Sequence, residues 1–368
     1  MSINLISFFI NTVTSVLAAS SVALLIGVSE QEIYFKAVTY SVLISMLFYP
    51  PLEHAVSSLD KEKLSATLNV IKNYFLITLA VLMPFMYVFP DYILYMGALI
   101  CSLGELCVRI SILQEKHKRI IFGNVLLLTA FALLYYLVDK AHFSYGIKEH
   151  IAFFYFLRGT LVSFTRYGSF KINYLLPLLD LRKLNYTLSN IINAVIGVIF
   201  INILYVNTQQ MTANTFALCQ RVFGTFLGVF SLWIYPISLR LVNDKKLMLR
   251  LFSLTWFFSV LLILFIFMIH YFYNDVCYKN ICFNAGFLFS FILNISVLPV
   301  VAFRFIESKY NKEKFRLRFN ITFMVLYSIV LVIAPYIDIE SIYILFYCNL
   351  FFNVMLIFSY LKFMKEIV

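Results

Sequence analysis

Residues 251–271 have the sequence LFSLTWFFSVLLILFIFMIHY, a run of 21 residues without Asp, Glu, Lys or Arg. An α-helix rises about 1.5 Å per residue, so about 20 apolar residues cross the roughly 30 Å hydrocarbon core of a bilayer. Backbone polar groups cannot stay unpaired in hydrocarbon, which leaves helices or a closed barrel, and a continuous apolar run excludes the alternating pattern of a barrel. The stretch therefore predicts a transmembrane helix.

The rest of the chain has the same character. Of its 368 residues, 62% are hydrophobic and 13% charged, and the mean hydropathy is +0.90. A soluble domain carries about 25% charged residues, so this chain has too few to cover a surface that faces water. We predict an all-α, polytopic integral membrane protein of about twelve spans, with short connections and no soluble domain. The predicted spans are residues 3–27, 34–57, 69–89, 92–112, 120–138, 149–166, 184–206, 212–239, 249–271, 281–303, 318–336 and 341–363.

Lys and Arg residues gather in alternate loops. The even-numbered loops and the C-terminal tail hold 21 of the 29, whereas the odd-numbered loops hold Lys140, Lys148 and Lys279. The 21 are Lys61, Lys63, Lys116, Lys118, Arg119, Arg166, Lys171, Arg182, Lys183, Arg240, Lys245, Lys246, Arg250, Arg304, Lys309, Lys312, Lys314, Arg316, Arg318, Lys362 and Lys365. By the positive-inside rule this predicts an even number of spans with both termini cytoplasmic. The net charge of +11 is thus a topology signal, and we expect no nucleic-acid partner.

A short motif occurs twice in the chain. Tyr49-Pro50 and Tyr235-Pro236 both end predicted spans, each is followed by an Asp-Lys pair, and they lie 186 residues apart. We predict an N-terminal six-helix half (1–166), a cytoplasmic linker (167–183) and a C-terminal six-helix half (184–368), as in transporters built from repeats. The alternative is that each proline simply breaks its helix at the membrane surface.

Three basic residues inside or at the edge of predicted spans are candidates for substrate binding. Arg158 and Arg221 lie within spans and have no acid within four residues on their own helices, and Lys36 begins the second span. Ionisable groups in a membrane usually face a partner or a wet cavity, and arginine binds anions with two parallel donors. The alternatives are that the arginines tie neighbouring helices together or snorkel, and that Lys36 is an interfacial anchor.

Three further residues are candidates for ion coupling. Glu105 lies four residues before Arg109, where it can titrate or neutralise that arginine. Glu53 and His54 follow a Pro-Pro break, where they can couple to protons or form a solvated helix end. No metal-binding spacing and no soluble catalytic motif occur, so we predict no catalytic residues and no metal. The scattered cysteines indicate apolar packing, but Cys277 and Cys282 flank an outward loop, and whether they pair stays open.

The stretch from Ala213 to Pro236 resembles the eighth span of a known family. It follows a tight turn, carries the basic Arg221 about nine positions in, and ends at a proline. With two six-helix halves, the chain is similar to the polysaccharide (O-antigen) flippases of the multidrug/oligosaccharidyl-lipid/polysaccharide exporter superfamily. It departs from them in being short and in lacking an Asp or Arg between Leu188 and Tyr205.

The resemblance implies a transporter in the bacterial inner membrane, not an enzyme. It would flip an undecaprenyl-diphosphate-linked oligosaccharide to the outer leaflet by alternating access, coupled to a proton or sodium gradient and without a cofactor. Its implied partners are that saccharide, membrane lipids, a polysaccharide polymerase and a chain-length regulator. The rivals are an O-antigen-type polymerase, disfavoured by short outward loops, a multidrug exporter, whose cavity would feature acids, and a lipid II flippase, which usually has more spans.

Overall fold

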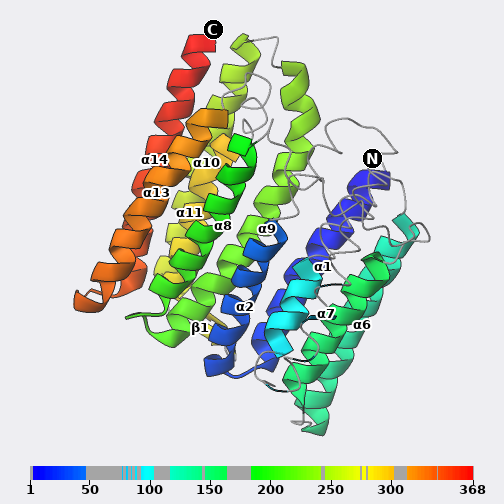
Figure 1. The fold of residues 1–368 in the computed structure, drawn as a ribbon. Coiled ribbons are helices and arrows are strands. Elements are labelled where there is room, and N and C mark those ends of the chain that lie inside the picture. Colours follow the sequence, from blue (N-terminus) through cyan, green and yellow to red (C-terminus); the bar gives the residue numbers. More distant parts are fainter. Residues whose placement is uncertain are drawn as a thin grey trace. The chain divides into compact units, whose positions relative to one another are not determined.

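The computed structural model describes most of the chain. The described residues are 3–46, 77, 80, 81, 84, 88, 93–102, 117–142, 146–163, 184–241, 245–273, 276–278, 281–301, 313–337 and 339–367. They are almost entirely helical (Figure 1). The chain packs as two compact units, residues 1–198 and 199–368, which are described separately.

The first unit is built from apolar helices. They are α1 (Ile3–Leu25), α2 (Val28–Met46), a helix at Ile93–Ser102, α6 (His117–Ala141), α7 (Ile147–Ser163) and most of α8 (Leu184–Leu204). α6 packs against both α1 and α7. The α1–α2 and α6–α7 turns lie at the same end of this unit, because Lys148 Nζ is 2.6 Å from Glu30 Oε1.

The second unit consists of longer helices and one hairpin. They are α9 (Gln210–Leu241), α10 (Lys245–Tyr273), β1 (Val276–Tyr278), β2 (Ile281–Phe283), α11 (Ala285–Val301), α13 (Glu313–Ile333), the 3₁₀ helix η4 (Ala334–Tyr336) and α14 (Ser341–Ile367). α11 contacts α9, α10 and α14, and α9, α11 and α14 run along one another (Figure 1). α11 is therefore the central helix of the unit.

Four described helices are long and apolar enough to cross a membrane. They are Ile120–Ala141, Arg250–Tyr273, Arg316–Tyr336 and Ser341–Lys362. Along α10, large apolar side chains such as Trp256, Phe257 and Phe265 are more than half exposed. An apolar face of this size needs a non-aqueous neighbour, and the acyl chains of a bilayer supply one. The predicted class of an all-α, membrane-embedded protein is confirmed at this level, and the number of twelve spans stays a prediction.

Two sequence predictions concern the division of the chain. The boundary between the compact units falls inside α8, between Val198 and Ile199, and the predicted linker 167–183 lies outside the described residues. The alternative that Pro236 breaks its helix at the membrane surface is wrong, because α9 continues through it to Leu241. Proline removes one backbone hydrogen bond, a loss that membrane helices often accommodate. The matching Tyr49-Pro50 lies outside the described residues.

The two ends of the second unit differ in charge. At the end that we call the hairpin end, Asn207 Nδ2 donates to Ala334 O (2.9 Å) and the Ile342 amide donates to Thr208 Oγ1 (3.0 Å). The described residues there include no Lys or Arg. The opposite end, which we call the basic end, carries Arg240, Lys245, Lys246, Arg250, Lys314, Arg316, Arg318, Lys362 and Lys365.

α9 and α11 approach most closely at a glycine. A Cβ at the buried Gly286 would lie 2.3 Å from Thr212 O and 3.0 Å from Phe216 N. Small residues at a helix contact let two backbones meet, which stabilises membrane bundles through dispersion contacts. The spacing Gly286, Ser290, Asn294 repeats every four residues and places all three on one face of α11.

Gly286→Ala is expected to lower the free energy of unfolding by about 3 kcal/mol, because the new methyl group meets backbone atoms that cannot move aside. The measurement is an SDS unfolding titration of the full chain in mixed micelles. Gly197→Ala is the matched control, since its Cβ would lie 3.7 Å from Thr39 Cγ2, an ordinary contact. Equal stability of the two variants would contradict the close approach of α9 and α11.

Candidate functional site

Arg158 lies in the core of the first unit and is 4% exposed. Its Nε donates to Asn124 Oδ1 (3.1 Å), its Nη2 to Asn11 Oδ1 (2.7 Å) and its Nη1 to Cys101 Sγ (3.4 Å). Asn124 Nδ2 also donates to Asn11 Oδ1 (3.3 Å). These residues come from α7, α6, α1 and the 93–102 helix, so a single guanidinium connects four helices.

Glycine next to Arg158 makes this arrangement possible. A Cβ at Gly159 would lie 2.7 Å from Ile100 Cγ2 and 2.8 Å from Ile100 O, so only glycine lets α7 approach the 93–102 helix this closely. That approach brings Arg158 to Cys101, the neighbour of Ile100. In this conformation protein encloses the guanidinium, and a substrate could reach it only if these helices separated.

Lys36 has a partner of its own in the first unit. Its Nζ lies 2.6 Å from Glu32 Oε1, four residues earlier on α2, and both side chains are partly exposed. Together with Lys148–Glu30 and Lys140–Asp139, this pair places an acid beside each lysine described near the α1–α2 and α6–α7 turns. Arg158 and Lys36 therefore have separate partners.

Arg221 lies on α9 of the second unit, and its side chain is partly exposed. It is eleven residues from the first residue of α9, about 16 Å along the helix axis. The preceding residue, Gln220, accepts a hydrogen bond at Oε1 from Asn294 Nδ2 of α11 (2.8 Å). A partly exposed guanidinium is suited to anions, and an amide pair on the adjoining residue is suited to hydroxyl groups.

A second amide connection joins α11 to α14. Asn353 Nδ2 donates to Ser296 Oγ (2.8 Å) and to Leu293 O (3.1 Å). Asn353 and Asn294 are both nearly buried, at 9% and 7% exposure. Of the two, Asn294 is the one bonded to α9, at Gln220, the residue before Arg221.

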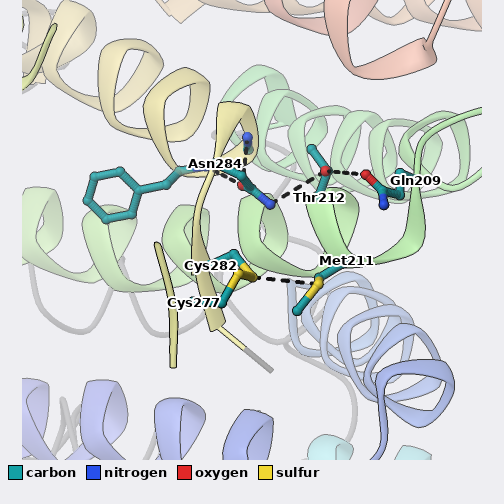
Figure 2. Close-up of a disulfide and its surroundings, with 8 residues drawn as sticks. Gln209, Met211, Thr212, Cys277, Cys282 and Asn284 are labelled. Atoms are coloured by element: carbon teal, nitrogen blue, oxygen red, sulfur yellow. Dashed lines mark hydrogen bonds between the residues drawn. A yellow bond between two sulfur atoms is a disulfide. The ribbon is translucent and has the colours of Figure 1, made fainter. Parts of the chain in front are cut away.

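A disulfide closes the hairpin end of the second unit (Figure 2). Cys277 and Cys282 are opposite one another in the antiparallel β1–β2 pair and are joined, with Cα atoms 4.1 Å apart. The question that the sequence left open is thereby answered. Cys282 Sγ also lies 3.5 Å from Met211 Sδ, which brings the hairpin against the start of α9.

Asn284 extends this connection into α11. Its Oδ1 accepts hydrogen bonds from the backbone amides of Gly286 (3.0 Å) and Phe287 (3.4 Å), so it caps the helix. Its Nδ2 donates to Thr212 Oγ1 of α9 (3.4 Å), which in turn donates to Gln209 Oε1 (3.5 Å), as Figure 2 shows. The hairpin end therefore holds the first turns of α9 and α11 together.

The remaining candidates lie elsewhere. Glu105, Glu53 and His54, the predicted ion-coupling residues, are outside the described residues. Within the part of the chain that the structure describes, no three His, Cys, Asp or Glu residues come together in a way that could hold a metal ion.

No protein-family model, curated protein or solved structure matches this chain. Any function must therefore be inferred from the chain's own residues. Sequence reasoning did not single out Asn11, Asn124, Gln220 or Asn294, although each lies within a predicted span. A polar amide inside an apolar run was the available signal, since such side chains commonly hydrogen-bond across membrane helices.

Arg158→Ala is expected to destabilise the protein by about 3 kcal/mol, because it removes three hydrogen bonds from a charged donor and leaves a cavity. The stability of Arg158→Lys should lie between those of the wild type and Arg158→Ala, since one ammonium group cannot reproduce the planar guanidinium and its several donors. The measurement is the SDS mole fraction at half-unfolding. Arg318→Ala, at an exposed position on α13, is the control. If it shifts the midpoint as much as Arg158→Ala, the four-helix connection has no special role.

Proposed function

We propose that this protein is a membrane transporter that carries an anionic, lipid-linked saccharide from the cytoplasmic to the outer leaflet of a bacterial inner membrane. The observation that supports this proposal is Arg221, partly exposed about 16 Å along a helix that is 32 residues long. An ionisable group within a membrane span commonly marks a substrate or ion pathway. A guanidinium presents two parallel donors, which suits the oxygens of a diphosphate linkage.

The physical need for such a protein follows from the chemistry of the cargo. A saccharide head group cannot enter hydrocarbon without losing its hydrogen bonds to water, which costs several kcal/mol for each polar group. The apolar lipid tail, by contrast, can stay in the hydrocarbon of the bilayer at no such cost. A polar path for the head group alone is sufficient, and alternating access between two halves would open that path to each side in turn.

We further propose that both termini are cytoplasmic and that the hairpin end faces outward. Two independent features support this orientation. The basic end carries the described Lys and Arg residues of the helix ends, as the positive-inside rule requires of the cytoplasmic side. The disulfide at the hairpin end requires an oxidising compartment, and the cytoplasm keeps thiols reduced.

This orientation predicts how the hairpin thiols react. With Cys282 changed to Ser, the exposed Cys277 should be labelled by a membrane-impermeant maleimide in intact spheroplasts, because it faces the outside. The readout is a mass shift of the full-length chain. A variant lacking both hairpin cysteines shows the background from the other cysteines, which include the buried Cys101 and Cys219 and the partly exposed Cys348. Labelling of Cys277 only after permeabilisation would reverse the proposed topology.

The transport proposal predicts what happens when the gene is deleted. Complete lipid-linked repeat units should accumulate on the cytoplasmic leaflet, because their synthesis continues while their exit is blocked. The wild-type gene on a plasmid should restore surface glycan. Arg221→Ala should not restore it, although the variant should insert into the membrane in normal amount. The measurement combines extraction of lipid-linked saccharides with a leaflet-specific labelling of their sugars.

Two results would count against the proposal in different ways. Single repeat units that reach the surface without polymerising would identify the protein as a polymerase instead. Full export by the Arg221→Ala variant would remove that residue from the mechanism. Arg316→Ala is the matched control, since this arginine lies at the basic end and not in mid-helix.

A further inference from the structure

Two amide side chains beside Arg221 are held in fixed orientations. Asn294 uses both hydrogens of its amide, one bonded to Gln220 Oε1 (2.8 Å) and the other to Ser290 O (2.8 Å). These two bonds fix the plane of the amide and leave its oxygen as the group able to accept a further bond. The bond to Gln220 likewise leaves the Nε2 hydrogens of Gln220 as donors. Among the described residues, neither Asn294 Oδ1 nor Gln220 Nε2 has another hydrogen-bond partner.

The space in front of the Asn294 oxygen is open because residue 224 is glycine. Gly224 is exposed, and the one atom that a Cβ there would meet within 4 Å is Asn294 Oδ1, at 4.0 Å. Gln220 and Gly224 are four residues apart and share a face of α9, while Arg221 and Gly224, three apart, are neighbours on the helix surface. The open space is therefore bordered by a donor, an acceptor and a cation.

An aromatic pair comes from residues three positions from the two amides, after Gln220 on α9 and before Asn294 on α11. Phe223 of α9 packs edge-on against Phe291 of α11, with ring centroids 5.0 Å apart, and both rings are partly exposed.

Amide groups in a fixed donor–acceptor pair match the hydroxyl groups of a sugar, each of which both donates and accepts. A bare phosphate offers acceptors and would leave the Asn294 oxygen unmatched.

We propose that Gln220, Gly224 and Asn294 form a subsite that binds hydroxyl groups of a saccharide, next to a diphosphate held by Arg221. This inference rests on the proposed function, and it divides recognition of the cargo between two sets of residues. Arg221 binds the anionic linkage that every cargo of this class carries. The amide pair selects cargo that has a sugar attached, since the carrier lipid without its sugar gains nothing from it.

The test compares two probes on the purified full-length protein in detergent. One is undecaprenyl diphosphate, and the other is undecaprenyl diphosphate linked to N-acetylglucosamine. The wild type should bind the sugar-bearing probe about tenfold more tightly, as expected for one or two additional neutral hydrogen bonds. Gly224→Leu should abolish this preference by filling the open space, and Asn294→Leu should abolish it by removing the acceptor. Neither variant should change the affinity for the bare diphosphate.

Two control variants separate recognition from packing. Asn353→Leu removes an equally buried amide with two interhelical bonds that lies away from Arg221, and Phe226→Trp adds bulk at an exposed position of α9. Both should keep the tenfold preference. A Cβ at Gly224 would meet no backbone atom within 4 Å, so Gly224→Leu provides a test that does not depend on how well Asn294→Leu folds.

The outcomes distinguish this inference from the proposed function. If Gly224→Leu and Asn294→Leu keep the tenfold preference, or if the wild type binds both probes equally, the saccharide subsite is wrong. In either case, a loss of affinity for both probes in Arg221→Ala would leave the transport proposal intact. If the wild type binds neither probe, the proposed function falls and the subsite falls with it.

Discussion

Hydrocarbon does not hydrogen-bond, and this one constraint underlies the structure. It makes the described chain almost wholly helical, because a helix satisfies its own backbone. It also makes each polar side chain inside the bundle find a partner on another helix or reach a wet surface. Arg158 meets the constraint with three acceptors from three helices. Asn353 and Asn294 meet it with pairs of bonds that join α11 to its neighbours or to itself. The polar groups thus specify which helices pack together. Apolar side chains cannot do this alone, because they contact lipid tails and neighbouring helices about equally well.

At the hairpin end of the second unit, close helix packing and a disulfide also hold α9 and α11 together. Gly286 lets α11 meet the backbone of α9, Asn284 caps α11 while bonding Thr212 of α9, and the disulfide holds the hairpin beside Met211. These contacts act on the same two helices within their first turns. α9 and α11 run in the same direction from this point, so their contact continues to Gln220 and Asn294. The position of Asn294 relative to Arg221 is therefore a consequence of packing that begins two turns earlier.

The helical class and the position of most helices could be predicted from the length of the apolar runs. A continuous apolar run of about 20 residues commonly forms a transmembrane helix. The range predicted as 212–239, for example, is α9 at Gln210–Leu241. The proline at position 236 did not mark a helix end, because a long membrane helix can absorb the loss of one backbone hydrogen bond. Whether Cys277 and Cys282 pair could not be predicted, because pairing depends on the register of two strands that are too short to be recognised in the sequence. Sequence reasoning could not find the partners of Arg158, which lie 34, 57 and 147 residues away in the chain.

The two arginines that the sequence treated alike have different surroundings, and this difference carries the argument about function. Arg158 is enclosed, its donors are directed at protein acceptors, and a glycine beside it brings a neighbouring helix close. Such a group adds specificity to the fold. Arg221 is partly exposed, and the glycine near it leaves space open instead of admitting another helix. A partly exposed cation in mid-helix, near a fixed acceptor and open space, is the feature on which the proposed function rests. A ligand that carries both negative charge and hydroxyl groups would match a guanidinium and a fixed amide pair, which is why we propose a lipid-linked saccharide and not a simple anion.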